Sequence, residues 1–361
     1  MSARPSEVSD PLLGEIGRQG AAIRGAAAAL GHQADAIRAI ARDRPDGRIV
    51  LTGMGSSLAA GHALVATLGR AGIPVDLVNA AELLHFGLPT LDARTTLVVV
   101  SQSGRSVEVV RILDALPGGA GGRPFVVGIT NGPANPLSDA ADVALDIAVG
   151  DELGPATMTF AATLVALDAL GRLLLTRDRP TGAVVDEVTR AAGDAALAID
   201  RLTQDRPALI DAVTGWADGR RTLVIVGRGV GRAASDMASL TLKEVAGVAA
   251  ESMISADFRH GPLELVGPDL AIAFICVERE TDAIDRAFAA ELGRGPTSVL
   301  VVEESADAPA GVRSIVIGPV AGTLAPAVAV VPFQLLAREL AIAAGRRPGA
   351  FRHASKVTTT E

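Results

Sequence analysis

The sequence lacks large aromatic side chains and has very little cysteine. It contains no tyrosine and one tryptophan, and aromatic residues make up 2% of its 361 positions. A core without such rings must be filled by aliphatic side chains, as in a parallel sheet packed against alanine-rich helices. The one cysteine, Cys276, excludes an intrachain disulfide and a metal site built from several cysteines. Because it lies in the apolar run 270–277, we expect a small buried hydrophobe rather than a nucleophile.

Long basic blocks and long apolar runs are also absent. The net charge is −8, whereas proteins that bind nucleic acid neutralise many phosphates with clustered lysine and arginine. No uninterrupted apolar run approaches the roughly 20 residues that a membrane-spanning helix needs. The first residues show no apolar stretch after Arg4 that would mark a signal peptide. We therefore expect a cytoplasmic protein with no nucleic-acid partner and no membrane partner.

Length and pattern predict two domains. A chain of 361 residues with 49% hydrophobic content is ample for two ordinary α/β cores. A strand, a glycine turn and a helix follow one another at 48–57 and again at 222–232, which suggests two copies of one fold. The predicted class is α/β, with two tandem domains that are each a flavodoxin-like αβα sandwich around a parallel sheet. The predicted boundaries are an N-terminal helical segment at 1–44, domains at 45–205 and 206–345, and a C-terminal tail at 346–361.

The strands and helices within these domains are predicted from apolar runs and helical periodicity. The predicted strands lie at 48–53, 74–78, 97–100, 125–130 and 143–149 in the first half, and at 222–227, 270–277, 298–302 and 312–317 in the second. Long helices are predicted at 157–175 and 232–248, among others. The alternation of strand and helix is typical of right-handed βαβ units.

The segment between the third strand and its following helix carries the ligands of a phosphate. It reads Ser101-Gln-Ser-Gly-Arg-Ser106 and supplies three hydroxyls, one amide and a glycine within six residues. At the carboxyl end of a parallel strand the chain turns into a helix, whose free N–H groups and dipole favour an anion. A helix cap alone would need only one serine. The loop therefore predicts a phosphate site that needs no basic surface.

This loop, together with Gly53-Met-Gly-Ser-Ser57 after the first strand, resembles the sugar-isomerase (SIS) proteins. The likeness extends over about 45–361 and is strongest to the isomerase half of glucosamine-6-phosphate synthase and to the stand-alone glucosamine-6-phosphate deaminases. The resemblance implies two tandem SIS domains and a sugar-phosphate substrate. The implied substrate-binding residues are Ser57, Ser101, Gln102, Ser103 and Ser106.

Three matches in the second half imply the catalytic groups of that family. Glu244 in Leu-Lys-Glu-Val corresponds to a proton-shuttling glutamate, and His260 in Phe-Arg-His-Gly-Pro to a ring-opening histidine. Lys356, five residues from the chain end, corresponds to a lysine of the family's C-terminal motif. Moving a proton between C1 and C2 of an open-chain sugar needs one such base, and a cation offsets the charge of the enediolate. The resemblance also implies a homodimer in which His260 reaches the neighbouring subunit's site.

The leading interpretation is an enzyme that converts glucosamine 6-phosphate to fructose 6-phosphate and ammonia, because no glutaminase domain or early cysteine precedes the SIS pattern. Thr241 and Met158 stand where these enzymes usually have lysines. An aldose–ketose isomerase, or a deglycase that cleaves a sugar–amine adduct, therefore remains an alternative. We expect no cofactor and no metal, since the other four histidines have no metal-ligand spacing.

Two further interpretations are weaker. A sugar-phosphate sensor would normally carry a helix-turn-helix domain, and residues 1–42 are too short and too poor in basic residues for one. A dinucleotide site at 227–231 lacks the spacing of the third glycine. In the second half, Glu278 and Glu280 stand where the first half has its serines, so we expect one phosphate site in the chain.

Overall fold

The computed structural model describes residues 10–116, 122–175, 179–306, 308–320 and 322–360. Its framework is two five-stranded sheets, in which every recorded strand pair is parallel. The strand order is β2-β1-β3-β4-β5 in the first sheet and β10-β9-β8-β6-β7 in the second. The predicted α/β class with two parallel-sheet units is thus confirmed.

The strands of the first sheet lie close to their predicted positions. They are β1 Ile49–Gly53, β2 Val75–Asn79, β3 Thr96–Val100, β4 Phe125–Thr130 and β5 Val143–Asp146. The strands of the second sheet are β6 Thr222–Gly227, β7 Ala250–Met253, β8 Leu270–Cys276, β9 Ser298–Glu303 and β10 Arg313–Val316. The apolar runs succeed as predictors because both faces of the inner strands are buried; all seven residues of β8 are buried.

Helices cover both sheets and connect them. In the first half they are α1 Pro11–His32, α2 Ala34–Asp43, α3 Ser56–Arg70, α4 Ala80–Glu82, α5 Val107–Ala115, α6 Pro136–Ala140 and α7 Met158–Leu175. In the second half they are α8 Thr181–Gln204, α9 Arg206–Ala217, α10 Gly231–Thr241, α11 Ser255–Phe258, α12 Asp282–Gly293, α13 Ala325–Ala329 and α14 Val331–Ala343. Short irregular helices lie at Leu83–Gly87, Leu88–Thr90, Leu242–Ala246, Pro262–Leu265 and Gly322–Leu324.

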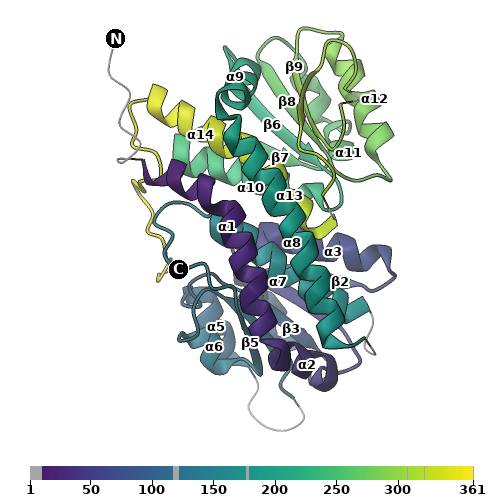
Figure 1. Cartoon of the computed structure of the whole chain (residues 1–361), viewed down its shortest axis with the longest axis vertical. Helices are drawn as coiled ribbons and strands as arrows, with labels where there is room; N and C mark the ends of the chain where they lie inside the picture. Colours follow the sequence, from purple (N-terminus) through teal and green to yellow (C-terminus); the bar gives the residue numbers. More distant parts are fainter. Residues whose placement is uncertain (1–9, 117–121, 176–178, 307, 321, 361) are drawn as a thin grey trace.

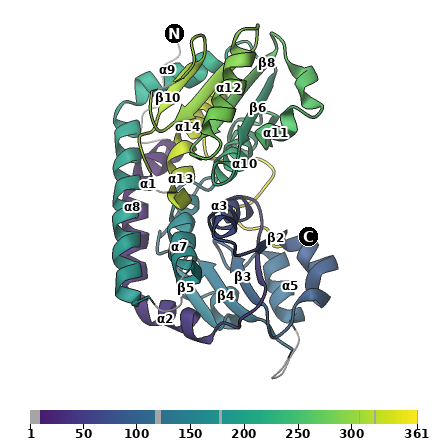
Figure 2. The same ribbon diagram turned by 90° about the vertical axis from the view of Figure 1, so that its right-hand side faces the viewer.

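The two sheets lie at opposite ends of an elongated molecule, and α1 and α8 run along one side of both (Figures 1 and 2). One large apolar core extends from the inner face of the first sheet, through α1, α7, α8 and α10, to the inner face of the second. Two smaller apolar clusters fill the other face of each sheet. The halves are therefore joined by a shared core, and a site between them can be held rigidly.

The proposed boundaries at 44/45, 205/206 and 345/346 stay a prediction, and residues 1–9 lie outside the described part.

Two stretches, Met158–Leu175 and Gly322–Ala343, have the length and composition of membrane spans. Within the fold, however, 89% and 78% of the residues in their most apolar windows are buried. Burial of this extent is typical of the core helices of a globular protein rich in apolar residues.

Three local predictions were wrong or incomplete. The helix predicted over 232–248 ends at Thr241, and a π-helical turn, η4 Leu242–Ala246, follows it. Strand β7 escaped prediction because, at the edge of its sheet, it carries Glu251 and Ser252 in place of an apolar run. The predicted strand 143–149 ends early, at Asp146, and the chain then turns at Ala148 with a φ of 49°.

Candidate active site

The loop at 101–106 turns sharply between strand β3 and helix α5. Gly104 makes this turn possible because its φ is 61°, in the left-handed region that side chains disfavour. A Cβ at this position would also lie only 1.8 Å from Oδ1 of Asn135. Asn135 is buried and donates its amide to the carbonyl oxygen of Gly132, 2.9 Å away. The buried, hydrogen-bonded side chain of Asn135 therefore packs against this turn and restricts its backbone.

The serines of this loop gather at the start of α5. Ser101 Oγ lies 3.4 Å from Ser106 Oγ, and Ser103 Oγ accepts a hydrogen bond from the backbone N–H of Arg105 at 3.1 Å. Ser57 approaches from the first residues of α3, whose N-terminus follows the turn at Gly55. Two helix N-termini and four hydroxyls thus meet at the carboxyl ends of neighbouring strands, an arrangement that favours an anion.

These residues line a cavity of about 300 Å³ that the second half completes. Of the eight residues predicted for the site, seven line this cavity: Ser57, Ser101, Gln102, Ser103, Ser106, Glu244 and Lys356. The cavity draws them from strand ends in the first half, from the π-helical turn and from the C-terminal tail. Their roles stay predictions, but the structure brings together groups that are up to about three hundred residues apart in sequence.

Glu244 enters the cavity from η4, the π-helical turn. The turn ends at Gly247, which has a φ of 67°. The surrounding protein raises the pKa of Glu244 through partial desolvation; the charge of Glu152 raises it further, and that of Lys356 opposes the rise. Water still reaches the carboxylate from the cavity side. A carboxylate with a raised pKa is better matched to proton transfer near neutral pH than an ordinary one.

Lys356 is held in place by a buried carboxylate. Its Nζ lies 2.7 Å from Oε2 of Glu152 and 2.6 Å from the carbonyl oxygen of Gly154. The tail is also fixed farther along, where the backbone N–H of Val107 donates to the carbonyl oxygen of Thr358 at 3.1 Å. This contact lays the tail across the start of α5, beside the phosphate loop. The ammonium is therefore positioned rather than loosely tethered.

Glu152 is the site residue that the sequence did not reveal. Its side chain has no exposed surface, and it accepts hydrogen bonds from the backbone N–H and hydroxyl groups of Thr157 and Thr159 at the start of α7. Those threonines are a signal for a carboxylate that caps a helix. Nothing in the sequence indicates the pairing with Lys356, however, because 204 positions separate the two residues.

His260 does not line the cavity. It lies exposed in the turn after α11, outside the set of residues that surround Glu244. The structure of one chain thus leaves the predicted ring-opening group outside its own site. Thr241 and Met158 are both buried, and Thr241 donates its hydroxyl to the carbonyl oxygen of Met237.

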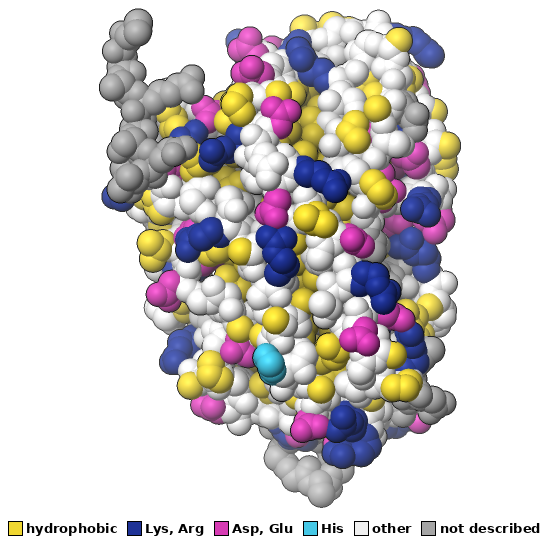
Figure 3. Space-filling model, in the orientation of Figure 1, with side chains coloured by type: hydrophobic (Ala, Val, Ile, Leu, Met, Phe, Trp, Pro, Cys, Tyr) yellow, Lys and Arg dark blue, Asp and Glu magenta, His cyan; other side chains and the backbone are white. Residues whose placement is uncertain are grey.

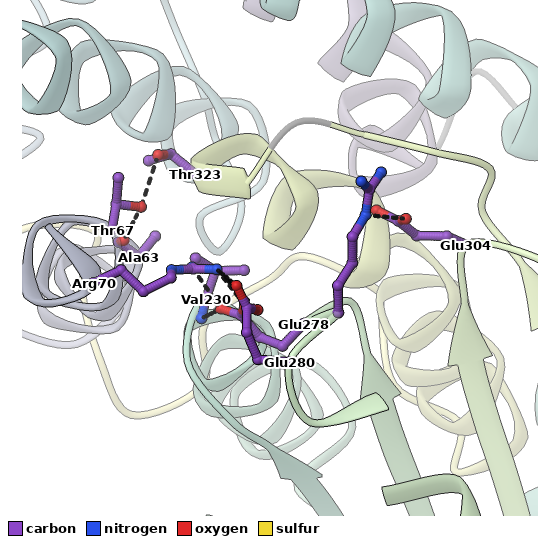
Figure 4. A network of polar contacts seen from close by, with 9 residues as sticks. Ala63, Thr67, Arg70, Val230, Glu278, Glu280, Glu304 and Thr323 are labelled. Carbon is purple, nitrogen blue, oxygen red and sulfur yellow. Dashed lines mark hydrogen bonds and ion pairs between the residues drawn. The ribbon is translucent and has the colours of Figure 1, made fainter. Parts of the chain in front are cut away.

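In the second half, the loop after β8 stands where the first half has the loop at 101–106, and its Glu278 caps the N-terminus of α10, the helix that follows β6. Glu278 follows β8 and accepts a hydrogen bond from the backbone N–H of Val230, at the start of α10, at 2.5 Å. Arg70 from α3 pairs with Glu278 at 2.8 Å and with Glu280 at 3.2 Å (Figure 4). An anion of the protein itself therefore uses the donors that a phosphate would need, and it ties the two halves together.

Other reactive groups are accounted for among the described residues. Cys276 is buried, as predicted, and burial raises the pKa of its thiol well above the usual range. No group of three or more histidine, cysteine, aspartate or glutamate side chains in the described ranges could hold a metal ion.

Comparison with known proteins agrees with this geometry. Residues 44–172 match the family model of the SIS domain. The chain is 32% identical over 330 residues to a glutamine–fructose-6-phosphate aminotransferase (isomerizing) of Aeropyrum pernix; the match covers 87% of this chain and 51% of the relative. The chain spans about half the length of the curated relatives it matches.

Solved structures share the whole fold. The C-terminal domain of glucosamine-fructose-6-phosphate aminotransferase from Francisella tularensis aligns with a TM-score of 0.79 at 19% identity, over 97% of this chain and 100% of that one. Glucosamine-6-phosphate deaminase from Thermotoga maritima aligns with a TM-score of 0.71 at 20% identity, over 97% and 99% of the chains. The family-model match identifies residues 44–172 as an SIS domain, and the sequence relatives extend the likeness over most of the chain.

Proposed function

We propose that this chain is an amino-sugar-phosphate deaminase and isomerase that converts glucosamine 6-phosphate and water into fructose 6-phosphate and ammonia. One observation carries the proposal: the serine loop, Glu244 and Lys356 line a single cavity of about 300 Å³. Relatives named for aminotransferase, isomerase and deaminase reactions of sugar phosphates support an enzyme of this class. Like those metabolic enzymes, the protein is expected to act in the cytoplasm.

The phosphate would lie against the loop at 101–106, where backbone N–H groups and hydroxyls converge. Anchoring this end fixes the distance between the phosphate and the reacting carbons. Glu244, which lines the same cavity, would then reach C1 and C2 of the open-chain sugar. The carboxylate removes the proton from C2 and returns it to C1, which converts the amino aldose into a ketose imine. Water adds to the imine carbon, and ammonia leaves.

Lys356 would stabilise the charge that develops on the substrate oxygen during this transfer. Its ammonium is oriented by Glu152 and Gly154, so little reorganisation is needed when that charge appears. Ring opening needs a further acid and base, which we assign to His260 of a neighbouring subunit. An aldose–ketose isomerase or a deglycase would use the same proton transfer, and would differ from the deaminase in the group on C2.

A panel assay tests the proposal. Purified chain is offered 6-phosphates of glucosamine, galactosamine and mannosamine, and of the corresponding hexoses, while ammonia and ketose phosphate are measured separately. We expect ammonia and ketose in equal amounts from at least one amino sugar. Ketose formation from a hexose phosphate without ammonia release would identify an isomerase instead.

The Glu244→Gln variant is the control for chemistry. Loss of the base should lower kcat by about 10²- to 10⁴-fold and leave the affinity for the sugar phosphate within a few-fold. Calorimetry measures the affinity without turnover. Binding with no product from either chain, across the panel, would favour a sugar-phosphate sensor and refute the deaminase assignment.

A further inference from the structure

The start of helix α1 packs against segments that surround the candidate active site. The Cβ that Gly349 lacks would lie 3.2 Å from the Cβ of Leu12, so α1 contacts the turn that leads into the C-terminal tail (Figure 1). Asp10, at the N-cap of α1, pairs with Arg338 of α14 at 2.6 Å. This helix lies outside residues 44–172, the part that the SIS family model matches. It is nevertheless a neighbour of the cavity.

Glu15 is a buried carboxylate on the inner side of α1. Acidic and basic side chains are interspersed over the molecular face in Figure 3, and Arg18 and Arg24 of α1 are also exposed. Glu15, by contrast, has only 1% of its surface exposed. Its Oε1 accepts hydrogen bonds from the backbone N–H groups of Leu153 at 2.6 Å and Gly154 at 3.4 Å. Its Oε2 is buried without a hydrogen-bond partner among the described residues, which is costly in a core and more typical of a functional site.

The backbone that Glu15 binds also supplies both acceptors of the Lys356 ammonium. Nζ of Lys356 lies 2.7 Å from Oε2 of Glu152 and 2.6 Å from the carbonyl oxygen of Gly154. The loop from Glu152 to Gly154 therefore lies between two side chains: its N–H groups point to Glu15, and its acceptors point to Lys356. A Cβ on Gly154 would lie 3.0 Å from Oε2 of Glu15 and 3.5 Å from the carbonyl oxygen of Gly349. The loop is thus closely packed on the side of α1.

We propose that Glu15 is a positioning residue of the active site, which places the Lys356 ammonium by holding the loop that carries its two acceptors. The proposal rests on the proposed function, in which this ammonium stabilises the charge that develops on the substrate. Glu15 is not among the residues that line the cavity, so it acts through the loop and not on the substrate. Its replacement should slow turnover and leave the binding of the sugar phosphate at 101–106 intact.

The surroundings of Glu15 favour its neutral form. Desolvation by burial raises the pKa of this carboxyl group, the N–H of Leu153 opposes the rise, and the charge of Glu152 adds to it. The role of Glu15 in the loop is to accept two hydrogen bonds, which a neutral group can also do. The amide oxygen of a glutamine can accept from the same N–H groups, so Glu15→Gln should retain the function.

Kinetics of substitutions at this contact test the proposal. Glu15→Ala leaves the two N–H groups without their acceptor, so kcat should fall at least about tenfold while KM changes less than about threefold. Glu15→Gln should keep kcat within about threefold of the unsubstituted chain. Gly154→Ala serves if Glu15→Ala does not fold: its methyl group would displace the carboxylate, and kcat should fall by about threefold or more. Equal losses in Glu15→Gln and Glu15→Ala would overturn the proposal.

Coupling to Lys356 separates positioning from a general loss of structure. If Glu15 acts through the ammonium, adding Glu15→Ala to Lys356→Ala should lower kcat by less than about twofold further. The matched control is Asp10→Asn, which weakens another buried contact of α1, the ion pair with Arg338. It should lower the free energy of unfolding and leave kcat normal. Additive losses in the double variant, or a loss of kcat in the control equal to that of Glu15→Ala, would contradict the proposal.

A measurement without substrate distinguishes failure of this proposal from failure of the proposed function. The chain has two lysines, Lys243 and Lys356, so acetylation by acetic anhydride can be followed at each by mass spectrometry, with Lys243 as the internal reference. Labelling of Lys356 requires its release from Glu152 and Gly154, so its rate reports how firmly the loop holds the ammonium.

We expect the labelling of Lys356 relative to Lys243 to rise at least about threefold in Glu15→Ala and to stay unchanged in Glu15→Gln. Unchanged labelling in Glu15→Ala would refute the positioning role whatever reaction the chain catalyses. Increased labelling in a chain that converts no sugar phosphate of the panel would support the positioning role and refute only the deaminase assignment.

Discussion

Glu152 shows how one buried charge can set the properties of the groups around it. Its carboxylate has no exposed surface. Its two oxygens accept hydrogen bonds from four donors of Thr157 and Thr159 and from the ammonium of Lys356. A buried ion pair is tolerated when every remaining lone pair is satisfied in this way. Desolvation is the main cause of the raised pKa of Glu244; the charge of Lys356 opposes this rise, and the charge of Glu152 adds to it. Glu152 is therefore a positioning residue that also tunes the proposed base.

The Glu152→Gln variant separates these two effects. Removing the negative charge should lower the pKa of Glu244, so the acidic limb of kcat/KM against pH moves to lower pH. In the unsubstituted chain, the midpoint of the acidic limb should lie above pH 4.5, the ordinary pKa of a glutamate. Activity needs the deprotonated carboxylate of Glu244, and the pKa of that group is raised. The loss of the ion pair should also reduce kcat, by about tenfold or more. The pH–rate profile of both chains measures the shift.

Glu187→Gln is the matched control for this charge. Glu187 is also ion-paired, to Arg172 and Arg179, and its pKa is lowered to about 2 by those partners. It does not line the candidate active site, so its replacement should leave the acidic limb in place. A decrease in activity of the Glu152 variant with no movement of the limb would mean that the residue acts only through structure.

At the residue scale, the sequence predicted most of the proposed residues that line the cavity, but it did not reveal Glu152, which pairs with Lys356. Ser101, Ser103 and Ser106 stand together within six positions, so their convergence at a helix start follows from local geometry. Glu244 and Lys356 were assigned by resemblance, and the structure places both in the cavity. Glu152 was missed because its importance depends on a partner 204 positions away, and no local pattern records such a contact.

Among the elements, the π-helical turn η4 has the most direct bearing on the site. Helix α10 ends at Thr241, and the following turn, Leu242–Ala246, carries Glu244 into the cavity before Gly247 ends it. Single π-helical turns are frequent at functional sites because the extra residue redirects a side chain. Gly247 has a φ of 67°, and a Cβ there would lie 1.9 Å from a guanidinium nitrogen of Arg346. The glycine thus permits both the turn and the close arginine.

Gly247→Ala should therefore impair catalysis more than phosphate binding. The substitution forces a strained backbone and displaces Arg346, so the turn that bears Glu244 should shift. We expect the free energy of unfolding to fall by about 1–2 kcal/mol and kcat to fall at least tenfold. The KM for the sugar phosphate should change little, because the loop at 101–106 is untouched. Chemical denaturation and steady-state kinetics measure the two effects.

Gly219→Ala supplies the comparison. Gly219 has a φ of 68°, almost the same as Gly247, but open space surrounds its Cβ position and it lies after α9, outside the cavity of the candidate active site. Its replacement should lower stability through backbone strain alone and leave kcat normal. Equal kinetic losses in the two variants would show that backbone strain, and not displacement of Glu244, is responsible.

The elements also show where sequence patterns fail. Apolar runs located β4 and β6 because these strands are buried on both faces. The edge strand β7 and the π-helical turn were missed for different reasons. Glu251 makes β7 resemble a loop, whereas Leu242 and Val245 of η4 keep the apolar spacing of an ordinary helix. A π-helical turn differs by one inserted residue, which periodicity over a few positions does not resolve.

At the scale of the whole molecule, the two halves repeat one sheet topology but contribute different residues to the cavity. The strand-end loop of the first half remains open to a ligand, whereas the equivalent place in the second half is filled by Glu278 and Arg70. The second half instead supplies Glu244 and the tail that carries Lys356. The site therefore forms only when both halves are packed together through their shared core.

One predicted group is still missing from this arrangement. His260 is exposed and lies outside the residues that line its own chain's cavity, although the proposed ring opening needs an acid and base. Exposure of such a residue is what a site shared between two subunits requires. We therefore predict a homodimer in which each cavity is completed by the partner's turn after α11, with the two sites related by symmetry.

Mixing two inactive chains tests this arrangement. Ser103→Ala should disable the phosphate loop of its own chain, and His260→Ala should disable the neighbouring chain's site. In a dimer of one chain of each kind, one site combines both substitutions and the other contains neither. After unfolding together and refolding, random pairing makes half of the dimers mixed, so activity should recover to about a quarter of that of the unsubstituted protein. Each variant refolded alone should stay inactive. If the mixture also stays inactive while chromatography shows dimers, His260 acts within its own chain; activity of the His260→Ala chain alone would show that the residue has no role in the reaction.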